Sequence, residues 1–285
     1  MKIMKTTKIL SIFFAGLFLF ASCDKIEADA NGNYIVFSGN TGTWYDSDIE
    51  LPATQRAIVE KYTGVRCTNC PDADVVINTA LGKYGETLLA IGVHSGRFGE
   101  PLNGEQDLRT EEGTAWFEFF GITAQPSAIV NRTHSGSSWD LFTPTAGFDD
   151  RIDAIVNRSA QVAVQVLSRH NAGNNYTADI YLDYKDDLTV PQTLTLLVIE
   201  DSIFTTQRGQ GEEFDNYAQN HVLRQVVTNE WGMDIDASGT KGTRRFVSLS
   251  FDLREDCLPE HCHLVAFVSN KETRQIINAA ECELK

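Results

Sequence analysis

The chain lacks three features that would assign it to common classes of protein. Basic residues are scarce: 24 of them face 39 acidic residues, so the formal net charge is −15. Such an acidic protein repels phosphate backbones, which argues against nucleic acid as a partner. Beyond the N-terminus no segment approaches 18 uninterrupted apolar residues, so no membrane-spanning helix is expected there. Internal repeats and low-complexity tracts are also absent from the sequence.

Motifs of several enzyme classes are missing as well. No Ser/His/Asp spacing, phosphate-binding loop or paired-carboxylate motif stands out, and we expect no cofactor. We expect His94, His134 and His221 to be structural or solvated rather than catalytic. The apolar fraction of 42% is sufficient for ordinary cores. After the N-terminal segment about 260 residues remain, a length that favours two domains.

The first 23 residues have the features of an export signal. Three lysines precede the apolar stretch 9–20, which is too short to span a bilayer. Two small residues then lead into Cys23, a pattern that resembles a bacterial lipoprotein signal with Cys23 lipidated and first in the mature chain. Lipidation with more than one acyl chain would anchor the protein to a membrane. An ordinary secretory signal cleaved nearby is the alternative.

The motif with most bearing on function is Cys67-Thr68-Asn69-Cys70-Pro71. It follows a predicted strand at 55–63 and begins a predicted helix at 68–83. A helix N-terminus stabilises a thiolate and lowers the pKa of a cysteine. At this place the pair is typical of a redox-active dithiol, with Cys67 as the nucleophile and Cys70 as the resolving cysteine. A structural disulfide and half of a zinc site are the alternatives.

The remaining pattern divides near residue 160. Before it we predict a strand at 88–94, a helix at 108–120, a strand that begins at Pro126 and a helix at 148–158. After it the alternation is typical of half-buried strands, which we place at 161–168, 176–184, 192–199, 245–253, 262–268 and 275–282. These strands predict an antiparallel sandwich-like domain. The excursion at 204–244 is too long to be a simple hairpin.

The order of the first elements resembles the thioredoxin fold over about residues 50–160. In that family a cis-proline loop faces the dithiol, so the resemblance implies that Pro126 belongs to one site with Cys67 and Cys70. Two departures concern proton transfer and charge. Lys61, with Glu60 beside it, stands where the family has a buried carboxylate. By strand alternation only one of these two side chains can point toward the cysteines.

The second departure is Arg66, which stands where the family usually has an aromatic residue. A guanidinium beside Cys67 should favour its thiolate. The pair between the cysteines is Thr68-Asn69, where thioredoxins have Gly-Pro. These departures leave the redox activity open.

Three stretches resemble a more specific family. They are Glu-Lys-Tyr-Thr-Gly-Val-Arg-Cys-Thr-Asn-Cys-Pro (60–71), Pro-Ser-Ala-Ile-Val-Asn-Arg (126–132) and Asn-His-Val-Leu-Arg (220–224). Together they are similar to the Bacteroidetes outer-membrane lipoprotein family named after a twenty-eight-kilodalton outer-membrane protein. The resemblance implies a lipid-anchored protein of the outer membrane or cell surface, outside the cytoplasm. It also implies an α/β thioredoxin-like domain followed by an all-β antiparallel sandwich-like domain. We place the signal at 1–23, a tether and lead-in at 24–50, the first domain at 51–160 and the second at 161–285.

Three further cysteines lie near the C-terminus. Because disulfides persist outside the cytoplasm, Cys257, Cys262 and Cys282 are best interpreted as one bridge plus an odd thiol. Both Cys257–Cys262 and Cys262–Cys282 pairings are open. A zinc cluster with His261 and His263 lacks a convincing second pair of ligands, and we expect no metal site.

Two functions remain. The first is thiol–disulfide exchange at Cys67 and Cys70 on extracytoplasmic protein substrates. The second is a non-catalytic surface binding or adhesion lipoprotein, in which the β-domain and the 204–244 excursion engage an extracellular macromolecule. In the second hypothesis the Cys-x-x-Cys pair is a structural disulfide. Burial of Cys67 from solvent would favour the second hypothesis.

Overall fold

The structure is a computed structural model, and it describes residues 36–38, 45–46, 50–235 and 239–285. The predicted signal at 1–23 lies outside the described residues, and Cys23 with it. Within the predicted tether at 24–50, the described residues include two short strands, 36–38 and 45–46. No helix among the described residues is long and apolar enough to cross a membrane.

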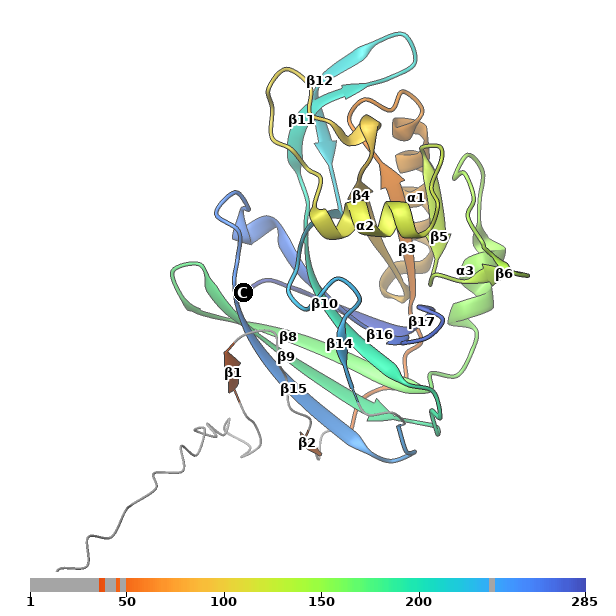
Figure 1. Cartoon of the computed structure of the whole chain (residues 1–285), viewed down its shortest axis with the longest axis vertical. Helices are drawn as coiled ribbons and strands as arrows, with labels where there is room; N and C mark the ends of the chain where they lie inside the picture. Colours follow the sequence, from red (N-terminus) through yellow and green to blue (C-terminus); the bar gives the residue numbers. More distant parts are fainter. Residues whose placement is uncertain (1–35, 39–44, 47–49, 236–238) are drawn as a thin grey trace, which may run out of the picture.

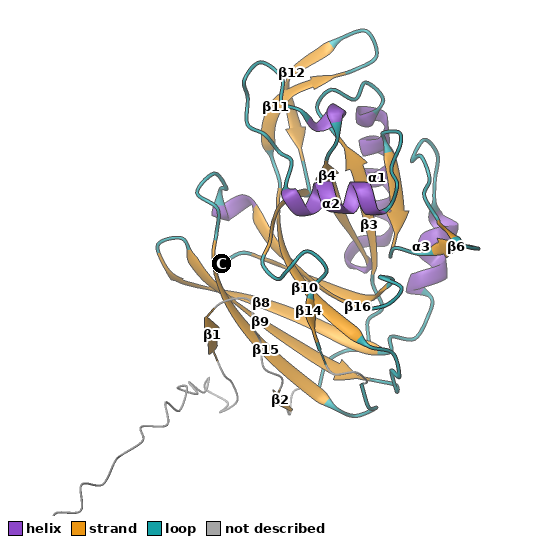
Figure 2. Ribbon diagram, in the orientation of Figure 1, coloured by secondary structure: helices purple, strands orange, loops and turns teal. Residues whose placement is uncertain are grey.

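Strands dominate the described part of the chain (Figures 1 and 2). The three α-helices there are α1 (Cys70–Tyr84), α2 (Glu111–Phe119) and α3 (Asp149–Val156). Short 3-10 helices cover Gly85–Thr87, Arg97–Gly99 and Pro259–His261. The predicted helix at 108–120 begins only at Glu111, because the Thr110 hydroxyl accepts a hydrogen bond from the Gly113 N–H and caps the helix.

An eight-stranded mixed sheet forms the centre of the molecule. Its order is β17 (Ile276–Glu283), β16 (Cys262–Asn270), β10 (Gln192–Glu200), β13 (Val222–Val226), β4 (Leu88–His94), β3 (Ala57–Thr63) and β5 (Ser127–Val130), with β14 (Met233–Asp234) paired to β10. Strands β3, β4 and β13 run parallel, whereas β5 is antiparallel to β3.

A second sheet packs against one end of the first. Its strands are β1 (Val36–Ser38), β15 (Arg244–Asp252), β9 (Asn175–Tyr184) and β8 (Val162–Ala172), with β2 (Tyr45–Asp46) also on β15. The core between the sheets contains Val164 and Ile180 from one side and Leu196 and Val268 from the other. The antiparallel strands predicted beyond residue 160 are therefore confirmed.

The other end of the central sheet carries the helices (Figure 1). Strand β3 alternates between its two faces, as strands do. Val59 packs with Ile77 of α1 and Ile152 of α3 on one face, whereas Ile58 packs with Trp116 of α2 on the other. Helices α1 and α2 thus cover opposite faces of β3 and β4.

Strand β13 joins the two ends of this sheet. It comes from the 204–244 excursion and lies between β10 and β4, where the Gly92 N–H donates to the His221 carbonyl at 2.7 Å. A Cβ atom at Gly92 would lie 3.3 Å from the Asn220 carbonyl oxygen, so glycine permits this close approach. One sheet therefore contains strands from both sides of residue 160, and the domain division at that residue stays a prediction.

Two hairpins complete the described strands. One is β6 (His134–Ser135) with β7 (Ser138–Trp139), and the other is β11 (Ile203–Arg208) with β12 (Glu213–Gln219). The second hairpin, which also belongs to the excursion, extends from the helical end of the molecule near the start of α1 (Figure 1).

Candidate functional site

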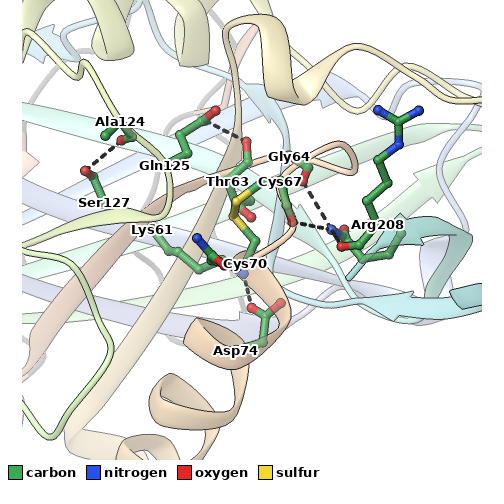
Figure 3. The surroundings of a disulfide bond; sticks show 12 residues. Lys61, Thr63, Gly64, Cys67, Cys70, Asp74, Ala124, Gln125, Ser127 and Arg208 are labelled. Carbon is green, nitrogen blue, oxygen red and sulfur yellow. Dashed lines mark hydrogen bonds and ion pairs between the residues drawn. A yellow bond between two sulfur atoms is a disulfide. The ribbon is translucent and has the colours of Figure 1, made fainter. Parts of the chain in front are cut away.

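Cys67 and Cys70 form a disulfide at the start of α1 (Figure 3). Their Cα atoms are 5.4 Å apart. The chain leaves β3 through a tight turn in which the Cys67 N–H donates to the Gly64 carbonyl at 3.0 Å. Pro71 follows in the first turn of the helix, where its missing N–H leaves no bond unmade. The strand–turn–helix setting predicted for the motif is present.

The disulfide is buried from solvent. Cys67 is 2% exposed and Cys70 is 1% exposed. Strand β11 is bonded to the turn that carries Cys67, since Gln207 Nε2 donates to the Cys67 carbonyl at 3.0 Å. The neighbouring Arg208 N–H donates to the Val65 carbonyl at 2.8 Å. No sequence pattern pointed to this contact, because Gln207 lies 140 residues from Cys67.

The β11–β12 hairpin is held against the helix start by further side chains. Gln210 Nε2 donates to Asn69 Oδ1 and Asp72 Oδ2 at 3.1 and 3.2 Å. Tyr217 donates its hydroxyl proton to Asp74 Oδ2 at 2.9 Å. The hairpin therefore contacts both the turn that contains Cys67 and the first two turns of α1.

The loop that contains Pro126 lies next to the end of β3 (Figure 3). The Gln125–Pro126 peptide bond is cis. Gln125 Nε2 donates to the Thr63 carbonyl at 2.8 Å and to the Ser95 carbonyl at 3.2 Å. The structure thus places the Pro126 loop near the turn that carries Cys67 and Cys70.

Strand alternation separates Lys61 from Glu60. Lys61 is 7% exposed and forms an ion pair with Asp74 of α1, beside the disulfide (Figure 3). Burial lowers the pKa of the Lys61 ammonium to about 7. Glu60 points to the opposite face, where it accepts two hydrogen bonds from Arg132 at 2.8 and 2.7 Å. Lys61, and not a strand carboxylate, therefore faces the disulfide side of the sheet.

Arg66 is held by the neighbouring loop. Its Nε donates to the Glu100 carbonyl at 2.8 Å, and its Nη2 donates to the Pro101 carbonyl at 2.7 Å. These bonds fix the guanidinium on the 97–101 segment. The sequence predicts that this side chain favours a Cys67 thiolate, but Cys67 is in a disulfide here and carries no such charge.

A second pair of cysteines lies at the far end of β10. The Cys257 and Cys262 thiols are buried and in contact, whereas Cys282 stands opposite Leu264 in the β16–β17 ladder. The hydrogen bond with Cys257, and then burial, raise the pKa of the Cys262 thiol well above its usual range. Of the two pairings left open by the sequence, the structure brings Cys257 and Cys262 together.

Glu200 joins these two cysteines, and sequence reasoning missed it. One carboxylate oxygen of Glu200 and the two sulfur atoms lie within 4.8 Å of one another. A signal existed in the sequence: Glu200 directly follows the strand predicted at 192–199, after the apolar run 196–199. His263, a ligand in the zinc cluster weighed above, instead lies 3.0 Å from Glu281 through its Nδ1 atom.

The three histidines singled out in the sequence differ in their exposure. His94 is buried, and its burial lowers its pKa to about 3, aided by the charges of Lys61 and Arg224. Burial also lowers the pKa of His221, against the opposing effect of Asp201. His134 is exposed and stacks on Trp139 with ring centroids 3.9 Å apart. Among the described residues, no hydrogen bond joins any of these three histidines to Cys67, Cys70, Cys257 or Cys262.

Comparison with known proteins identifies one family. The family model described as Outer membrane protein Omp28 matches residues 114–285, which is more than half of the chain. None of the curated proteins compared with the chain matches it.

Several solved structures are similar. HBP35 of Porphyromonas gingivalis matches with a TM-score of 0.65 and 18% identity, over 82% of this chain and 77% of that chain. A protein of Agrobacterium tumefaciens matches with a TM-score of 0.50 and 16% identity, over 82% and 96% of the two chains. A domain of the outer membrane lipoprotein Omp28 from Porphyromonas gingivalis covers 44% of this chain and 89% of its own, with a TM-score of 0.32 and 13% identity. At such identities the likeness to HBP35 and to the Agrobacterium protein shows the fold alone.

Proposed function

Since this chain belongs to the Omp28 family of outer membrane proteins, we propose that it is a non-catalytic binding lipoprotein with a structural Cys67–Cys70 disulfide. The family places the chain at the outer membrane, outside the cytoplasm. Disulfides persist in such a compartment without a catalytic role. The partner in this proposal is an extracellular macromolecule.

The burial of Cys67 is the observation that carries the proposal. Thiol–disulfide exchange begins when a thiolate attacks one sulfur atom of the disulfide, so the attacked sulfur must be accessible. Cys67 is 2% exposed, and Gln207 of the β11–β12 hairpin is bonded to its carbonyl. A substrate thiolate would therefore need a local opening of the structure around the disulfide before it could react.

The same contacts give the disulfide a structural task. It fixes the turn between β3 and α1, and this turn presents the Cys67 and Val65 carbonyls to the hairpin. The disulfide thereby supports the position of a hairpin that extends from the molecule. We assign the hairpin and the β-sheets to the binding surface. The net charge of −15 favours a partner with basic patches over a nucleic acid.

Anchoring through lipidated Cys23 completes the proposal. We expect the Cys23→Ser variant to move from the membrane fraction to the soluble envelope fraction, because the acyl chains are lost. An unchanged distribution would contradict anchoring at this residue.

The reduction potential of the Cys67–Cys70 pair tests the structural role. We expect a value below about −300 mV, the range of structural disulfides in exported proteins. We also expect no catalysis of insulin reduction by the wild-type protein with either dithiothreitol or glutathione. A potential near about −200 mV together with catalysed insulin reduction would overturn the proposal.

The arrangement around the Cys-x-x-Cys motif favours thiol–disulfide exchange as a second candidate. The strand–Cys-x-x-Cys–helix order, the helices on opposite faces of the sheet and the Pro126 loop beside Thr63 together support a thioredoxin-like arrangement. In this candidate, exchange occurs only after the hairpin has moved. A variant with Gln207→Ala and Tyr217→Phe removes two of the fastening contacts. Insulin reduction by this variant, abolished by Cys67→Ser, would support exchange, and inactivity would reject it.

A further inference from the structure

Three ligand atoms converge at the end of β10. They are the sulfur atoms of Cys257 and Cys262 and a carboxylate oxygen of Glu200, all within 4.8 Å of one another. All three residues are buried, and Glu200 is 2% exposed. Glu200 and Cys262 are direct partners in the β10–β16 ladder, so the sheet register sets their side chains on the same face.

The loop that carries Cys257 is fastened to the same carboxylate. The Leu258 N–H donates to Glu200 Oε1 at 2.8 Å, and the Cys257 N–H donates to the Arg254 carbonyl at 3.2 Å. The Pro259–His261 3-10 helix then returns the chain to β16. The three ligand atoms are therefore held in place before any ion arrives.

The second oxygen of Glu200 faces a buried cation. Oε2 forms an ion pair with Arg224 Nη1 at 3.1 Å, and both side chains are buried. Glu200 is therefore held as a charged carboxylate beside the two sulfur atoms.

We propose that Glu200, Cys257 and Cys262 bind a divalent metal ion, and that Zn²⁺ is the ion their chemistry fits. Thiolate sulfur and carboxylate oxygen are both ligands that Zn²⁺ accepts. With Zn–S distances of about 2.3 Å, tetrahedral geometry places two sulfur ligands about 3.8 Å apart, which is compatible with the observed cluster. The fourth position is filled by water or by a group of a partner.

Charge also fits this assignment. Binding releases the two thiol protons to solvent, so the site then contains two thiolates, one carboxylate and the ion. Among the buried groups, the charge of −3 on the ligands is offset by +2 on the ion and by +1 on Arg224; the exposed Asp256 carboxylate, which also pairs with Arg224, is balanced by Arg254. The buried cluster is neutral when it is loaded, which removes the large cost of an uncompensated buried charge.

Cobalt provides the test, because Co²⁺ bound to thiolates absorbs in the near ultraviolet. The full mature chain is purified from the cell envelope without reductant, so that Cys67 and Cys70 remain a disulfide, and is titrated with Co²⁺. We expect one equivalent to bind with a thiolate charge-transfer band, and we expect Zn²⁺ to displace it. Cys257→Ser and Cys262→Ser should each weaken binding more than about tenfold, and Glu200→Gln about tenfold. Cys282→Ser is the matched control and should bind as the wild type does.

A second measurement uses the wild-type protein alone, so the proposal can be tested even if the variants fail to fold. Calorimetric titration with Co²⁺ in buffers of different ionisation enthalpy should report about two protons released for each ion bound. The proposal is overturned if the wild type shows no band, or if Cys257→Ser binds Co²⁺ as tightly and with as strong a band as the wild type. It is equally overturned if peptide mapping of the envelope protein finds a Cys257–Cys262 disulfide.

Discussion

The two cysteine pairs of this protein differ in what surrounds them. Cys67 and Cys70 lie at the start of a helix, beside a hairpin from a distant part of the chain, and are joined by a bond. Cys257 and Cys262 lie in a loop and at the start of a strand, are not joined, and face Glu200. At the first pair the hairpin is bonded to the Cys67 carbonyl, whereas at the second pair a buried carboxylate lies within 4.8 Å of both sulfur atoms.

The comparison shows that spacing alone does not decide the chemistry of a cysteine pair. Both pairs are separated by only a few residues, and both are buried. The neighbours differ: the β11–β12 hairpin and the Lys61–Asp74 ion pair lie beside the disulfide, whereas the buried Glu200–Arg224 ion pair lies beside the two thiols. Four changes test this contrast, from the largest expected loss of stability to the smallest.

Removal of the cation at the second pair should have the largest effect. Arg224→Met leaves the Glu200 carboxylate buried without its compensating charge. We expect the free energy of unfolding in urea to fall by about 3–5 kcal/mol. Lys271→Met is the control, because its ion pair with Asp234 is at the surface, and it should cost less than about 1 kcal/mol. Equal losses in the two variants would show that Arg224 does not balance a buried charge.

Removal of the disulfide at the first pair should have a smaller effect. The double variant Cys67→Ser with Cys70→Ser frees a loop of four residues, which corresponds to a loss of about 2 kcal/mol in the free energy of unfolding. Reductant should lower the stability of the wild type and leave that of the variant unchanged. Cys282→Ser, which touches neither pair, serves as the control. A variant as stable as the oxidised wild type would argue against a structural role.

The pKa of His94 depends on both regions. Burial is the main cause of its low value, and the charges of Lys61, beside the first cysteine pair, and Arg224, beside the second, lower it further. Its pKa is about 3 in the folded chain and about 6.5 when unfolded, so only the unfolded chain takes up the proton between these values. The free energy of unfolding should therefore fall as pH decreases from 6.5 toward 3, by about 1–2 kcal/mol at pH 5. His94→Gln should remove this part of the acid dependence, measured by urea unfolding at several pH values. His170→Gln, at an exposed position, should keep the wild-type dependence; an unaltered slope in His94→Gln would contradict the assignment.

Loosening of the hairpin should have the smallest effect on stability. Gln207→Ala removes the hydrogen bond to the Cys67 carbonyl, at a cost of about 1 kcal/mol. If the hairpin opens locally, this change raises the rate of disulfide reduction by dithiothreitol about fivefold. Gln210→Ala, which breaks a more exposed contact, should raise the rate less. Identical rates in wild type and Gln207→Ala would mean that the hairpin does not control access.

Much of the fold was predictable because its elements have strong periodic patterns. The strand at 88–94 matches β4 in both bounds, since it is apolar throughout and ends before a polar loop. The helix predicted at 148–158 is shorter in the structure, Asp149–Val156, because the backbone of Phe148 is not helical and Phe148 and Asn157 cap its two ends. The Cys-x-x-Cys setting could be predicted for the same reason, since strand and helix flank it directly in the sequence.

The rest depends on contacts between distant residues, which no local pattern encodes. The place of β13 between β4 and β10 depends on the close approach at Gly92, and a glycine in an apolar strand is compatible with several roles. The hairpin over Cys67 depends on Gln207, an ordinary residue type for a strand. Only the register of β10 and β16 shows that Glu200 faces Cys262.

The position of β13 has a consequence for folding. Strands β3 and β4 precede residues 222–226 by more than a hundred positions in the chain, so they are synthesised well before β13. Until β13 is in place, β4 has an unpaired edge, and exposed edges of apolar strands promote aggregation. The central sheet is therefore complete only when most of the chain has been made, and a product truncated before residue 222 would carry an open edge.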